Sequence, residues 1–485
     1  MSNPPLPLDA AEPEYRRALG AGRLEEFDLT PLDRTRVPTI SVAWHTEKGT
    51  EHATGFGTSP QQARVSALGE LSEGIFPDAA VRRADRIGGS YRELVRSHGT
   101  GGIADPLELV LPAGSDYSPD QPLIWSTTIR LRTGEPVLVP IEFLASSPAP
   151  LTDVDQVRQW LITPITNGLG AGSSRDQAVT HGMLELLQRD GDTVSFRALD
   201  QGVVLDTRSL RDPELDRLLD SLARVGIDAV VKVAADEFVP VLYCVGEDRH
   251  AASTPPIALS AIGEAADPDP RAAARKAVLE FAASRARRIM AFGALDGLRP
   301  HFPDYIDDVI AAGIPTGQEP RALAEMIAWC RLDHAELREV LEPIFRRVRT
   351  VSADELRTSN TDATGDERLP FLLDRLAGFD VLVMDGADPD DTAIRTAKVV
   401  VPRIEVETLS YSRIGERVSR RLLDRRDDLV VREDGEGHRR IRLTDDAEQR
   451  LGGAVWLNQP RLDQVLGSLY PLYREPGWHA APMSV

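Results

Sequence analysis

The chain has 485 residues, of which 42% are hydrophobic and 27% charged, and its formal net charge is −20 at pH 7. This composition is typical of a globular protein, and no stretch approaches the roughly 20 apolar residues that a membrane-spanning helix needs. The acidic balance argues against a nucleic-acid partner, because binding through counterion release needs a basic surface. The length allows one large domain or two to three smaller ones.

The cysteines and the N-terminal residues indicate in which cellular compartment the protein is expected. Cys244 and Cys330 are the only cysteines and lie far apart in apolar runs, so a disulfide framework, a zinc site and a paired-thiol motif are unsupported. No basic region followed by an apolar stretch opens the chain, so we expect no secretory signal and a cytoplasmic location. Three early prolines predict a flexible tail over residues 1–14 and one ordered domain over 15–485.

A capped helix is predicted early in the chain. Residues 38–44 have the β-branched content of a strand, and residues 52–59 predict a glycine-containing turn. Ser59 is the predicted N-cap, Pro60 takes the first helical position and Gln62 completes a capping box. The pattern indicates a strand, a glycine turn and a helix.

The polar residues of this helix share one side. Ser66, Glu70 and Glu73 are spaced by four and three residues, so they lie on one helix face. A glutamate on an amphipathic helix is usually a solvated surface residue, and this is the default interpretation for each of them taken singly. Recurrence elsewhere in the chain is what favours a functional site.

Residues 166–197 repeat the design. The segment GLGAG allows a tight turn close to a ligand, Ser174 is a predicted N-cap with Gln177 three residues later, and a helix is predicted to begin near Arg175. In the first helix Gln62-Ala63 is followed by Glu70-Leu71, and in this helix Gln177-Ala178 is followed by Glu185-Leu186 at the same spacing.

The face of this second helix carries His181, Glu185 and Gln188. We interpret His181 as a structural or orienting histidine, because nothing in the sequence pairs it with a nucleophile. A third helix opens with Asp269-Pro270 and carries Glu280 at a similar depth. Three glutamate-bearing helices predict one shared site.

The remaining segments mix strands and helices. Residues 123–144 alternate apolar and polar residues around Thr133-Gly134, which predicts a β-hairpin. Residues 255–263 predict an apolar strand, and the polar run 357–369 predicts a surface loop and a candidate boundary.

A βαβ-like unit is predicted near the end of the chain. Residues 379–388 and 395–405 have the apolar content of two buried strands, with a helix expected to begin near Pro389 between them. The elements as a whole indicate a mixed α/β (α+β) fold.

The segments SALGELSE, NGLGAGSSRDQAVTHGMLELLQRD, AVLEFAASR and AKVVVPRIE together resemble the YcaO family, over about residues 30–480. Members of that family use ATP and Mg²⁺ to activate a peptide-bond oxygen, so that a nucleophile adds to the backbone carbonyl. The resemblance implies a YcaO-like fold that holds the nucleotide between the glutamate-bearing helices. It also implies a cyclodehydratase-like enzyme that forms azolines, or related thioamides or amidines, in a ribosomal precursor peptide.

Carried over position by position, the resemblance implies two sets of residues but no catalytic residue. The nucleotide-binding set is Ser66, Glu70, Ser173, Arg189 and Arg285. The metal-binding set is Glu70, Glu73, Glu185, Gln188 and Glu280. A triphosphate with Mg²⁺ needs carboxylates for the metal, a cation for the phosphates and backbone donors at helix starts, which such helices supply.

Several positions depart from the family pattern where nucleotide and metal contacts are expected. Where the family has Lys, Arg and Asn, this chain has Phe56, Gly74 and Ser173. Gln177 and Gln188 each replace a Glu of the family pattern, and Ala283 replaces a Gln. Loss of one such contact typically costs about 10- to 100-fold in metal affinity. Missing cations accompany missing carboxylates, so the charge losses partly offset one another.

Two functions from different classes stay open. The first is the ATP- and Mg²⁺-dependent enzyme just described. The second is a nucleotide-independent or non-catalytic relative that binds a peptide or a partner protein, and Phe56, Gln188 and Ala283 favour it. No leader-peptide-binding module is recognisable at the N-terminus, so we expect a separate partner protein to deliver the peptide. The resemblance also implies a homodimer.

Overall fold

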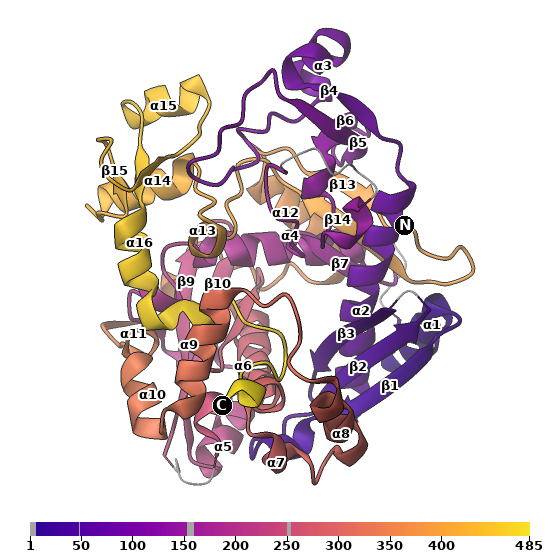
Figure 1. The fold of residues 1–485 in the computed structure, drawn as a ribbon, viewed down its shortest axis with the longest axis vertical. Coiled ribbons are helices and arrows are strands. Elements are labelled where there is room, and N and C mark those ends of the chain that lie inside the picture. Colours follow the sequence, from indigo (N-terminus) through magenta and orange to yellow (C-terminus); the bar gives the residue numbers. More distant parts are fainter. Residues whose placement is uncertain (1–5, 48, 153–159, 250–253) are drawn as a thin grey trace. The chain divides into compact units, whose positions relative to one another are not determined.

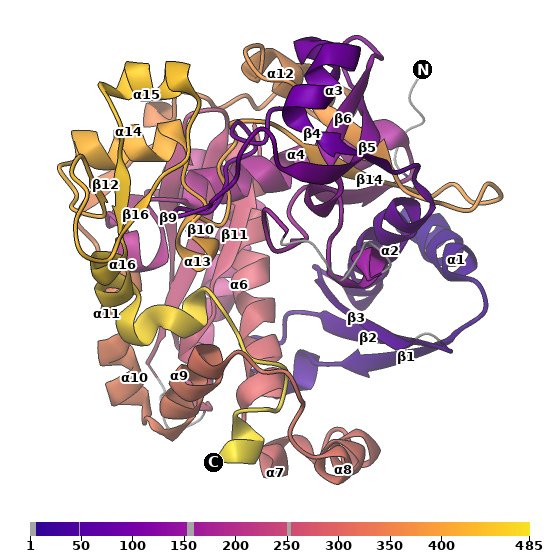
Figure 2. The same ribbon diagram turned by 45° about the horizontal axis from the view of Figure 1, so that its top comes forward.

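Figures 1 and 2 show the fold in a computed structural model that describes residues 6–47, 49–152, 160–249 and 254–485. The sequence predicts one domain over residues 15–485, whereas the structure separates two compact units. Unit 1 consists of Met1–Gly20, Gly69–Val194 and Ala363–Gln464, and unit 2 of Ala21–Leu68, Ser195–Asp362 and Val465–Val485. One boundary therefore falls inside the polar run 357–369.

Unit 1 contains a six-stranded sheet whose paired strands are all antiparallel. The strand order is β4-β5-β13-β14-β7, with β6 pairing β5. The strands are β4 (Ile87–Ser90), β5 (Pro122–Arg130), β6 (Pro136–Pro140), β7 (Leu169–Gly172), β13 (Leu382–Asp385) and β14 (Arg395–Val400). The hairpin predicted over residues 123–144 is confirmed as β5 and β6, and Gly134 at its turn has a φ of 75°, which favours glycine.

One helix covers the β7 end of this sheet. α4 (Arg175–Asp192) packs on β7 and β14, as Figure 1 shows. Unit 1 also contains α1 (Leu8–Leu19), α3 (Tyr91–His98), α12 (Arg368–Arg375), α13 (Thr408–Tyr411), α14 (Glu416–Asp424), α15 (Asp445–Leu451) and a small sheet of β15 (Val430–Val431), β17 (Trp456–Asn458) and β16 (His438–Arg440). Two helices cross a unit boundary along the chain, α2 (Pro60–Arg83) and α16 (Gln459–Leu466).

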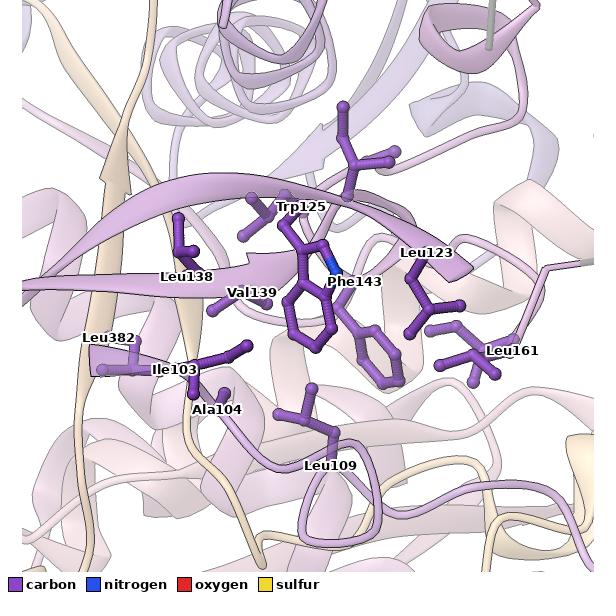
Figure 3. Close-up of a cluster of buried hydrophobic side chains, with 14 of the residues drawn as sticks. Ile103, Ala104, Leu109, Leu123, Trp125, Leu138, Val139, Phe143, Leu161 and Leu382 are labelled. Atoms are coloured by element: carbon purple, nitrogen blue, oxygen red, sulfur yellow. The ribbon is translucent and has the colours of Figure 1, made fainter. Parts of the chain in front are cut away.

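Trp125 of β5 lies in the hydrophobic cluster of unit 1 that Figure 3 shows. Its side chain is fully buried, and its Nε1 donates a hydrogen bond to the Gly89 carbonyl oxygen over 2.9 Å. Val139 and Phe143 lie beside it in the same cluster. A buried aromatic side chain removes about 150–250 Å² from water, so this cluster fixes the β5–β6 hairpin to the rest of the unit.

Unit 2 contains two sheets. The five-stranded sheet has the order β11-β10-β9-β8-β12, and β8 and β12 are its parallel pair. Its strands are β8 (Val203–Leu205), β9 (Ile227–Asp236), β10 (Pro240–Asp248), β11 (Gly263–Ala266) and β12 (Arg349–Val351). The three-stranded antiparallel sheet consists of β1 (Arg23–Asp28), β2 (Thr39–Thr46) and β3 (Gly49–Phe56).

Two helices of unit 2 lie against the five-stranded sheet. α6 (Pro270–Phe292) packs on β10 and β11 (Figure 2). α5 (Pro213–Arg224) packs on β9 and α6. The remaining helices are α7 (Leu295–Leu298), α8 (Pro303–Ala312), α9 (Pro320–Arg331), α10 (His334–Val340) and α11 (Glu342–Phe345). Among the residues described, no helix is long and apolar enough to cross a membrane.

A buried charged cluster braces the five-stranded sheet. Lys232 of β9 is fully buried, and its Nζ donates to Asp200 Oδ2 over 2.5 Å and to the Ile344 carbonyl oxygen over 3.0 Å. The hydroxyl of Tyr243 on β10 donates to the same carboxylate. A buried charge is tolerated when it is paired and hydrogen-bonded, and this cluster meets both conditions.

The prediction of a flexible tail over residues 1–14 is wrong from Leu8 onward, because α1 begins there; residues 1–5 lie outside the described part of the chain. Pro7 occupies the N-cap position of α1 instead of breaking it. The helix buries one face at helical spacing, including Ala11 and Tyr15, and an ion pair of 3.0 Å joins Arg16 to Glu12 one turn earlier.

The βαβ prediction is also wrong. β13 and β14 are antiparallel neighbours, and the segment between them, which includes Pro389, forms no helix. A parallel pair needs a crossover of about a dozen residues or more, and this link is too short for one. Asp388 instead closes the link by accepting hydrogen bonds from Thr396 N over 2.9 Å and Thr396 Oγ1 over 2.6 Å.

Two further segments differ from their predictions. Residues 255–263 form a 3₁₀ helix over Pro256–Ser260 that ends just before β11, so apolar content there reflects burial and not a strand. β3 extends into the segment predicted as a turn over residues 52–59, because it pairs with β2 as far as Phe56. The mixed class of helices and sheets is confirmed.

Candidate functional site

The starts of α2 and α4 are built alike. In each, the N-cap serine Oγ accepts a hydrogen bond of 3.2 Å from the backbone nitrogen of the predicted glutamine. Gln62 Oε1 accepts from Thr58 N and Thr58 Oγ1, both over 2.8 Å, and Gln177 Oε1 accepts from Ser173 N over 3.0 Å and Ser173 Oγ over 2.9 Å. The hydrogen bonds from the backbone to the N-cap serines therefore form as predicted. The side chain of each glutamine, however, accepts its hydrogen bonds from the residue before the N-cap serine, and not from the serine itself.

Each of the three glutamate-bearing helices approaches a strand at a glycine. A Cβ atom on Gly55 would lie 2.0 Å from a backbone nitrogen of α2, and one on Gly170 would lie 2.0 Å from a backbone oxygen of α4. A Cβ atom on Gly263 would lie 2.1 Å from a backbone oxygen of α6. Helix and strand backbones therefore touch at these points, where any larger residue is excluded.

Glu73 is a predicted metal ligand that one oxygen atom fixes to two neighbours. Its side chain on α2 is buried, and Oε1 accepts hydrogen bonds from Ala171 N of β7 over 2.8 Å and from His181 Nδ1 of α4 over 2.8 Å. In this arrangement His181 acts as a donor from Nδ1 that orients a carboxylate. Glu70, one turn earlier on α2, is exposed.

Glu185 of α4 is half-buried, and its Oε2 accepts a hydrogen bond of 2.9 Å from Gly168 N, next to the start of β7. Burial raises the pKa of its carboxyl group. The positive charge of Arg189 opposes this rise, and the negative charge of Glu73 adds to it. Glu73 and Glu185 therefore influence each other electrostatically while each is fixed to the backbone of the same glycine-rich segment.

Lys398 of β14 supports the turn that presents Gly168. Its Nζ donates to the carbonyl oxygens of Ile165 over 2.8 Å and of Asn167 over 2.7 Å, and its side chain is buried. Burial lowers the pKa of Lys398 to about 8, and the carboxylate of Glu185 opposes this shift. No local sequence pattern marks this lysine, because its hydrogen-bond partners lie more than 200 residues earlier in the chain.

Three other predicted residues of unit 1 lie on α4 or in its turn. Ser173 is half-buried, and its Oγ also accepts a hydrogen bond of 3.2 Å from Leu6 N. Gln188 is buried with 7% of its surface exposed, and Arg189 is half-buried. Unit 1 thus contains Glu70 and Glu73 of α2 and the α4 residues of the predicted sets, and Glu73 contacts α4 through His181.

In unit 2, Glu280 of α6 repeats the contact that Glu185 makes in unit 1. Its Oε2 accepts a hydrogen bond of 3.0 Å from Glu264 N of β11. Glu264 Oε1 in turn accepts from Arg197 Nη2 over 2.8 Å. The glutamate of α6 therefore joins its helix to the neighbouring strand.

Arg285 is fully buried in unit 2. Its Nε and Nη2 donate to the two carboxylate oxygens of Asp33 over 3.0 Å each, and Nη2 also donates to Asp248 Oδ2 over 3.0 Å. This geometry gives Arg285 a structural role, and its nucleotide contact stays a prediction. Ser66 lies half-buried on the part of α2 that belongs to unit 2. The convergence of all three helices on one site likewise stays a prediction.

The departures from the family pattern differ in their surroundings. Gln177 is occupied in capping α4, so its carbonyl oxygen already has local donors. Ala283 is buried in α6 with 4% of its surface exposed, while a Cβ on Gly74 would meet no atom within 4 Å. Phe56 is half-buried at the end of β3.

Glu405 caps a helix that follows the predicted site residues. Its carboxylate accepts hydrogen bonds from Gly415 N over 2.7 Å, Arg417 N over 2.6 Å and Val418 N over 3.1 Å, at the start of α14. Burial raises the pKa of Glu405 to about 7, against the lowering effect of Arg417.

The pKa of Glu405 predicts a pH dependence of stability. Between its ordinary value of 4.5 and about 7, the folded chain holds a proton that the unfolded chain has lost. The free energy of unfolding therefore falls as pH rises through this window, by up to about 3 kcal/mol from this group. Glu405→Gln should remove that slope. Urea unfolding of both proteins at pH 4.5 to 8 measures it, and parallel pH profiles would contradict the assignment.

The donors of unit 1 fit Mg²⁺ that arrives with phosphates. No group of three or more His, Cys, Asp or Glu side chains within the described ranges is placed to hold a metal ion by itself. Mg²⁺, however, is usually bound by one or two carboxylates together with substrate phosphates. Glu73 and Glu185 each have one oxygen fixed by a backbone N–H, and a cation beside them relieves their mutual repulsion.

Comparison with known proteins gives a consistent set of relatives. Residues 54–405 match the YcaO cyclodehydratase family, described as binding ATP and Mg²⁺. An uncharacterized protein from Methanothermobacter thermautotrophicus is 25% identical over 405 residues, which cover 82% of this chain and 94% of that protein.

The fold is similar to that of solved structures, among them a YcaO protein and a heterocyclase. The structure of YcaO from Methanopyrus kandleri bound with AMPPCP and Mg²⁺ has a TM-score of 0.56 and 21% identity, and the match covers 84% of this chain and 92% of that one. A heterocyclase in complex with substrate and cofactor has a TM-score of 0.59 and 16% identity, over 84% of this chain and 54% of that one.

Proposed function

The chain belongs to the YcaO family, and from this premise we propose that it is an enzyme that uses ATP and Mg²⁺ to modify the backbone of a peptide. In the reaction, ATP supplies a phosphoryl group to a backbone amide oxygen of the peptide, and a nucleophile forms a bond to the carbonyl carbon and gives up its protons. The carbon–oxygen bond then breaks, and the oxygen leaves as phosphate. With a neighbouring Cys, Ser or Thr side chain as nucleophile the product is an azoline, and with an external nucleophile it is a thioamide or amidine.

The observation that carries this proposal is the paired anchoring of Glu73 and Glu185 on one glycine-rich segment. Ala171 N holds the first and Gly168 N holds the second, over 2.8 and 2.9 Å. Two carboxylates with one oxygen fixed and like charges close together are suited to a cation that carries phosphates. Arg189 adds a positive charge beside Glu185.

The comparisons support the use of ATP and Mg²⁺. The family description names ATP and Mg²⁺, one fold relative is bound with AMPPCP and Mg²⁺, and another is a heterocyclase with substrate and cofactor. We propose a precursor peptide as the substrate and a separate protein that delivers it. Incubation of this protein with ATP, Mg²⁺ and candidate peptides, followed by mass spectrometry, identifies the modification by its mass change.

Isothermal titration of the wild-type protein with ATP tests the nucleotide part of the proposal. We expect binding in the presence of Mg²⁺ and much weaker binding with the metal chelated, because the carboxylates repel the uncompensated triphosphate. No heat of binding at millimolar ATP and Mg²⁺ would contradict it.

The second candidate function is a non-catalytic relative that binds a peptide or a partner protein. The observation that favours it is that Gln188 and Ala283 replace residues of the family pattern, and both are buried. Under this alternative, a peptide binds with the same affinity whether or not ATP and Mg²⁺ are present.

Gln188→Glu separates a weakened nucleotide site from a lost one. The change adds a carboxylate at a family position, so we expect tighter binding of ATP with Mg²⁺, by about tenfold. Ala283→Gln is less informative, since a polar side chain at a site with 4% exposure is expected to destabilise α6 by about 1–3 kcal/mol. Titration with ATP and Mg²⁺ measures the effect. Unchanged or weaker binding in Gln188→Glu would favour the second function.

A further inference from the structure

A cavity of about 690 Å³ lies in unit 1, and none of the predicted nucleotide or metal ligands is among its described lining residues. The apolar part of its lining includes the buried side chains of Ile103, Ala104 and Leu382, which Figure 3 shows next to one another. Charged residues from β5, residues 402–403 and α15 complete the lining. Ligand pockets usually have about 300–1,000 Å³, so this cavity can hold part of a ligand molecule.

Two arginines of the lining are already paired with carboxylates. Arg130 donates from Nε to Asp380 Oδ1 over 3.1 Å and from Nη1 to Glu135 Oε2 over 2.6 Å. Arg450 donates to the two carboxylate oxygens of Glu416 over 2.9 and 2.7 Å. These positive charges are therefore balanced within the protein and do not require an anionic ligand.

The third arginine, Arg403, has a backbone conformation that favours glycine, with a φ of 68°. Its backbone nitrogen donates to the Glu108 carbonyl oxygen over 2.7 Å. Its Nη2 donates to the Gly378 carbonyl oxygen, and its Cζ lies 4.7 Å from the centre of the Phe379 ring. Such strained residues persist only where their surroundings fix them, and they cluster at binding sites.

Three carboxylates of the lining differ from these arginines. Within the part of the chain that the structure describes, no hydrogen bond or ion pair reaches the carboxylates of Glu108, Asp445 and Asp446. Asp445 and Asp446 lie in the first turn of α15, where negative charge also stabilises the helix start. Glu108 lies in a turn and has no such role, so its carboxylate is the clearest sign of a missing partner.

Glu108 and Asp105 are half-buried in the cavity wall. Burial raises the pKa of Glu108, against the positive charge of Arg403. Burial also raises the pKa of Asp105, although Leu107 N donates to its Oδ1 over 2.9 Å. A carboxylate withdrawn from water is stabilised by a nearby cation, so a cationic ligand suits this wall.

A buried hydroxyl near this wall also lacks a partner. Tyr117 has 1% of its surface exposed, and its hydroxyl makes no hydrogen bond among the described residues. Burial raises the pKa of Tyr117, and the charges of Asp105 and Tyr91 in the cavity lining raise it further. Buried polar atoms nearly always have a partner in the protein or in a bound molecule.

The carboxylates of the cavity suit an organic cation better than a metal ion. Among the described residues, no group of three or more His, Cys, Asp or Glu side chains is placed to hold a metal ion. A guanidinium or ammonium group carries several N–H donors, so it can reach acceptors that are too far apart to share one metal ion. Its alkyl chain can pack on the apolar part of the lining.

We propose that the cavity binds a lysine or arginine side chain of the peptide substrate, with Glu108, Asp445 and Asp446 as its acceptors. That the cation comes from a peptide rests on the proposed function, whereas the positive charge of the ligand follows from the cavity itself.

Fluorescence anisotropy with a labelled, capped Gly-Arg-Gly-Arg-Gly peptide tests this proposal. The comparison peptide has citrulline in place of both arginines, which keeps the shape and removes the charge. We expect the wild-type protein to bind the arginine peptide at least about tenfold more tightly, and Glu108→Gln to lose about tenfold for that peptide alone. Equal affinity for the two peptides, or wild-type affinity in Glu108→Gln, would overturn the inference.

Asp434→Asn is the matched control, because a chain with a net charge of −20 attracts any basic peptide. Asp434 is an exposed residue of unit 1 between β15 and β16, and it does not line the cavity. Its replacement should leave the affinity unchanged, and equal losses in both variants would overturn the inference. The urea midpoint of Glu108→Gln should not fall; a lower midpoint with wild-type peptide affinity would show that Glu108 only supports Arg403.

Agmatine, a guanidinium on a short alkyl chain, separates a peptide from a free small cation. We expect it to displace the labelled peptide only at concentrations about tenfold or more above those of unlabelled peptide. Displacement at equal concentrations would overturn the peptide as the source of the cation. These titrations contain neither ATP nor Mg²⁺, so their failure would overturn this inference alone, whereas the ATP titration tests the proposed function.

Discussion

Gly170→Ala is expected to unfold at a much lower urea concentration than the wild-type protein. The added methyl group would lie 2.0 Å from the Ala178 carbonyl oxygen and 2.8 Å from Gly182 N, and both atoms belong to the α4 backbone. A side chain could turn away, but a helix backbone cannot move without leaving β7. We therefore expect a loss of more than about 3 kcal/mol in the free energy of unfolding, at the upper end for overpacked cores.

Gly74→Ala is the matched control, because the same methyl group is added inside a helix that has room for it. A Cβ on Gly74 meets no atom within 4 Å. Alanine is favoured over glycine in a helix by about 0.5–1 kcal/mol, so this variant should be slightly stabilised. If the free energy of unfolding falls in Gly170→Ala and rises in Gly74→Ala, the contact between β7 and α4 excludes the methyl group. A wild-type midpoint for Gly170→Ala would show that α4 does not pack on β7 as described.

The helices that are correctly predicted have start signals that lie within one helical turn. α4 and α6 begin at the predicted residues, because a side-chain cap and, in α6, a proline at the first helical position act within one turn. The sequence does not predict α1, because the three early prolines favour an extended tail and outweigh the alanines and leucines of residues 8–19. One of the contacts that fix this helix, between Glu14 and Ala393, is distant in the sequence.

The same distinction holds for the candidate site. The helical spacing that places Glu73 and Glu185 on the polar faces of their helices is a local signal, whereas their backbone donors Ala171 N and Gly168 N lie outside that pattern. The hydrogen-bond partners of Lys398 come from another segment, and no pattern within a window of residues brings them together. At Arg285 the resemblance to the family implies a nucleotide contact, whereas in the structure its side chain forms a buried ion pair with Asp33.

Glu73→Gln is expected to weaken binding of ATP with Mg²⁺ by about 10- to 100-fold, the largest effect on ligand binding that we predict for a single change. Glutamine keeps the shape of the side chain, and its carbonyl oxygen can still accept from Ala171 N and His181 Nδ1, as Glu73 Oε1 does. The change therefore removes charge and leaves the hydrogen bonds, so the urea midpoint should move little. Titrations with and without Mg²⁺ measure the effect, and the loss should be confined to the titration that contains the metal.

Glu93→Gln controls for the removal of a carboxylate from unit 1. Glu93 Oε2 accepts a hydrogen bond of 2.9 Å from Ser90 N in the capping box of α3, so it also serves the backbone. It belongs to neither predicted ligand set, and its replacement should leave ATP affinity as in the wild type. If both variants bind ATP and Mg²⁺ equally well, Glu73 is a structural cap that ties α2 to β7. If Glu73→Gln alone loses binding, and only when Mg²⁺ is present, the negative charge at residue 73 is what the metal requires.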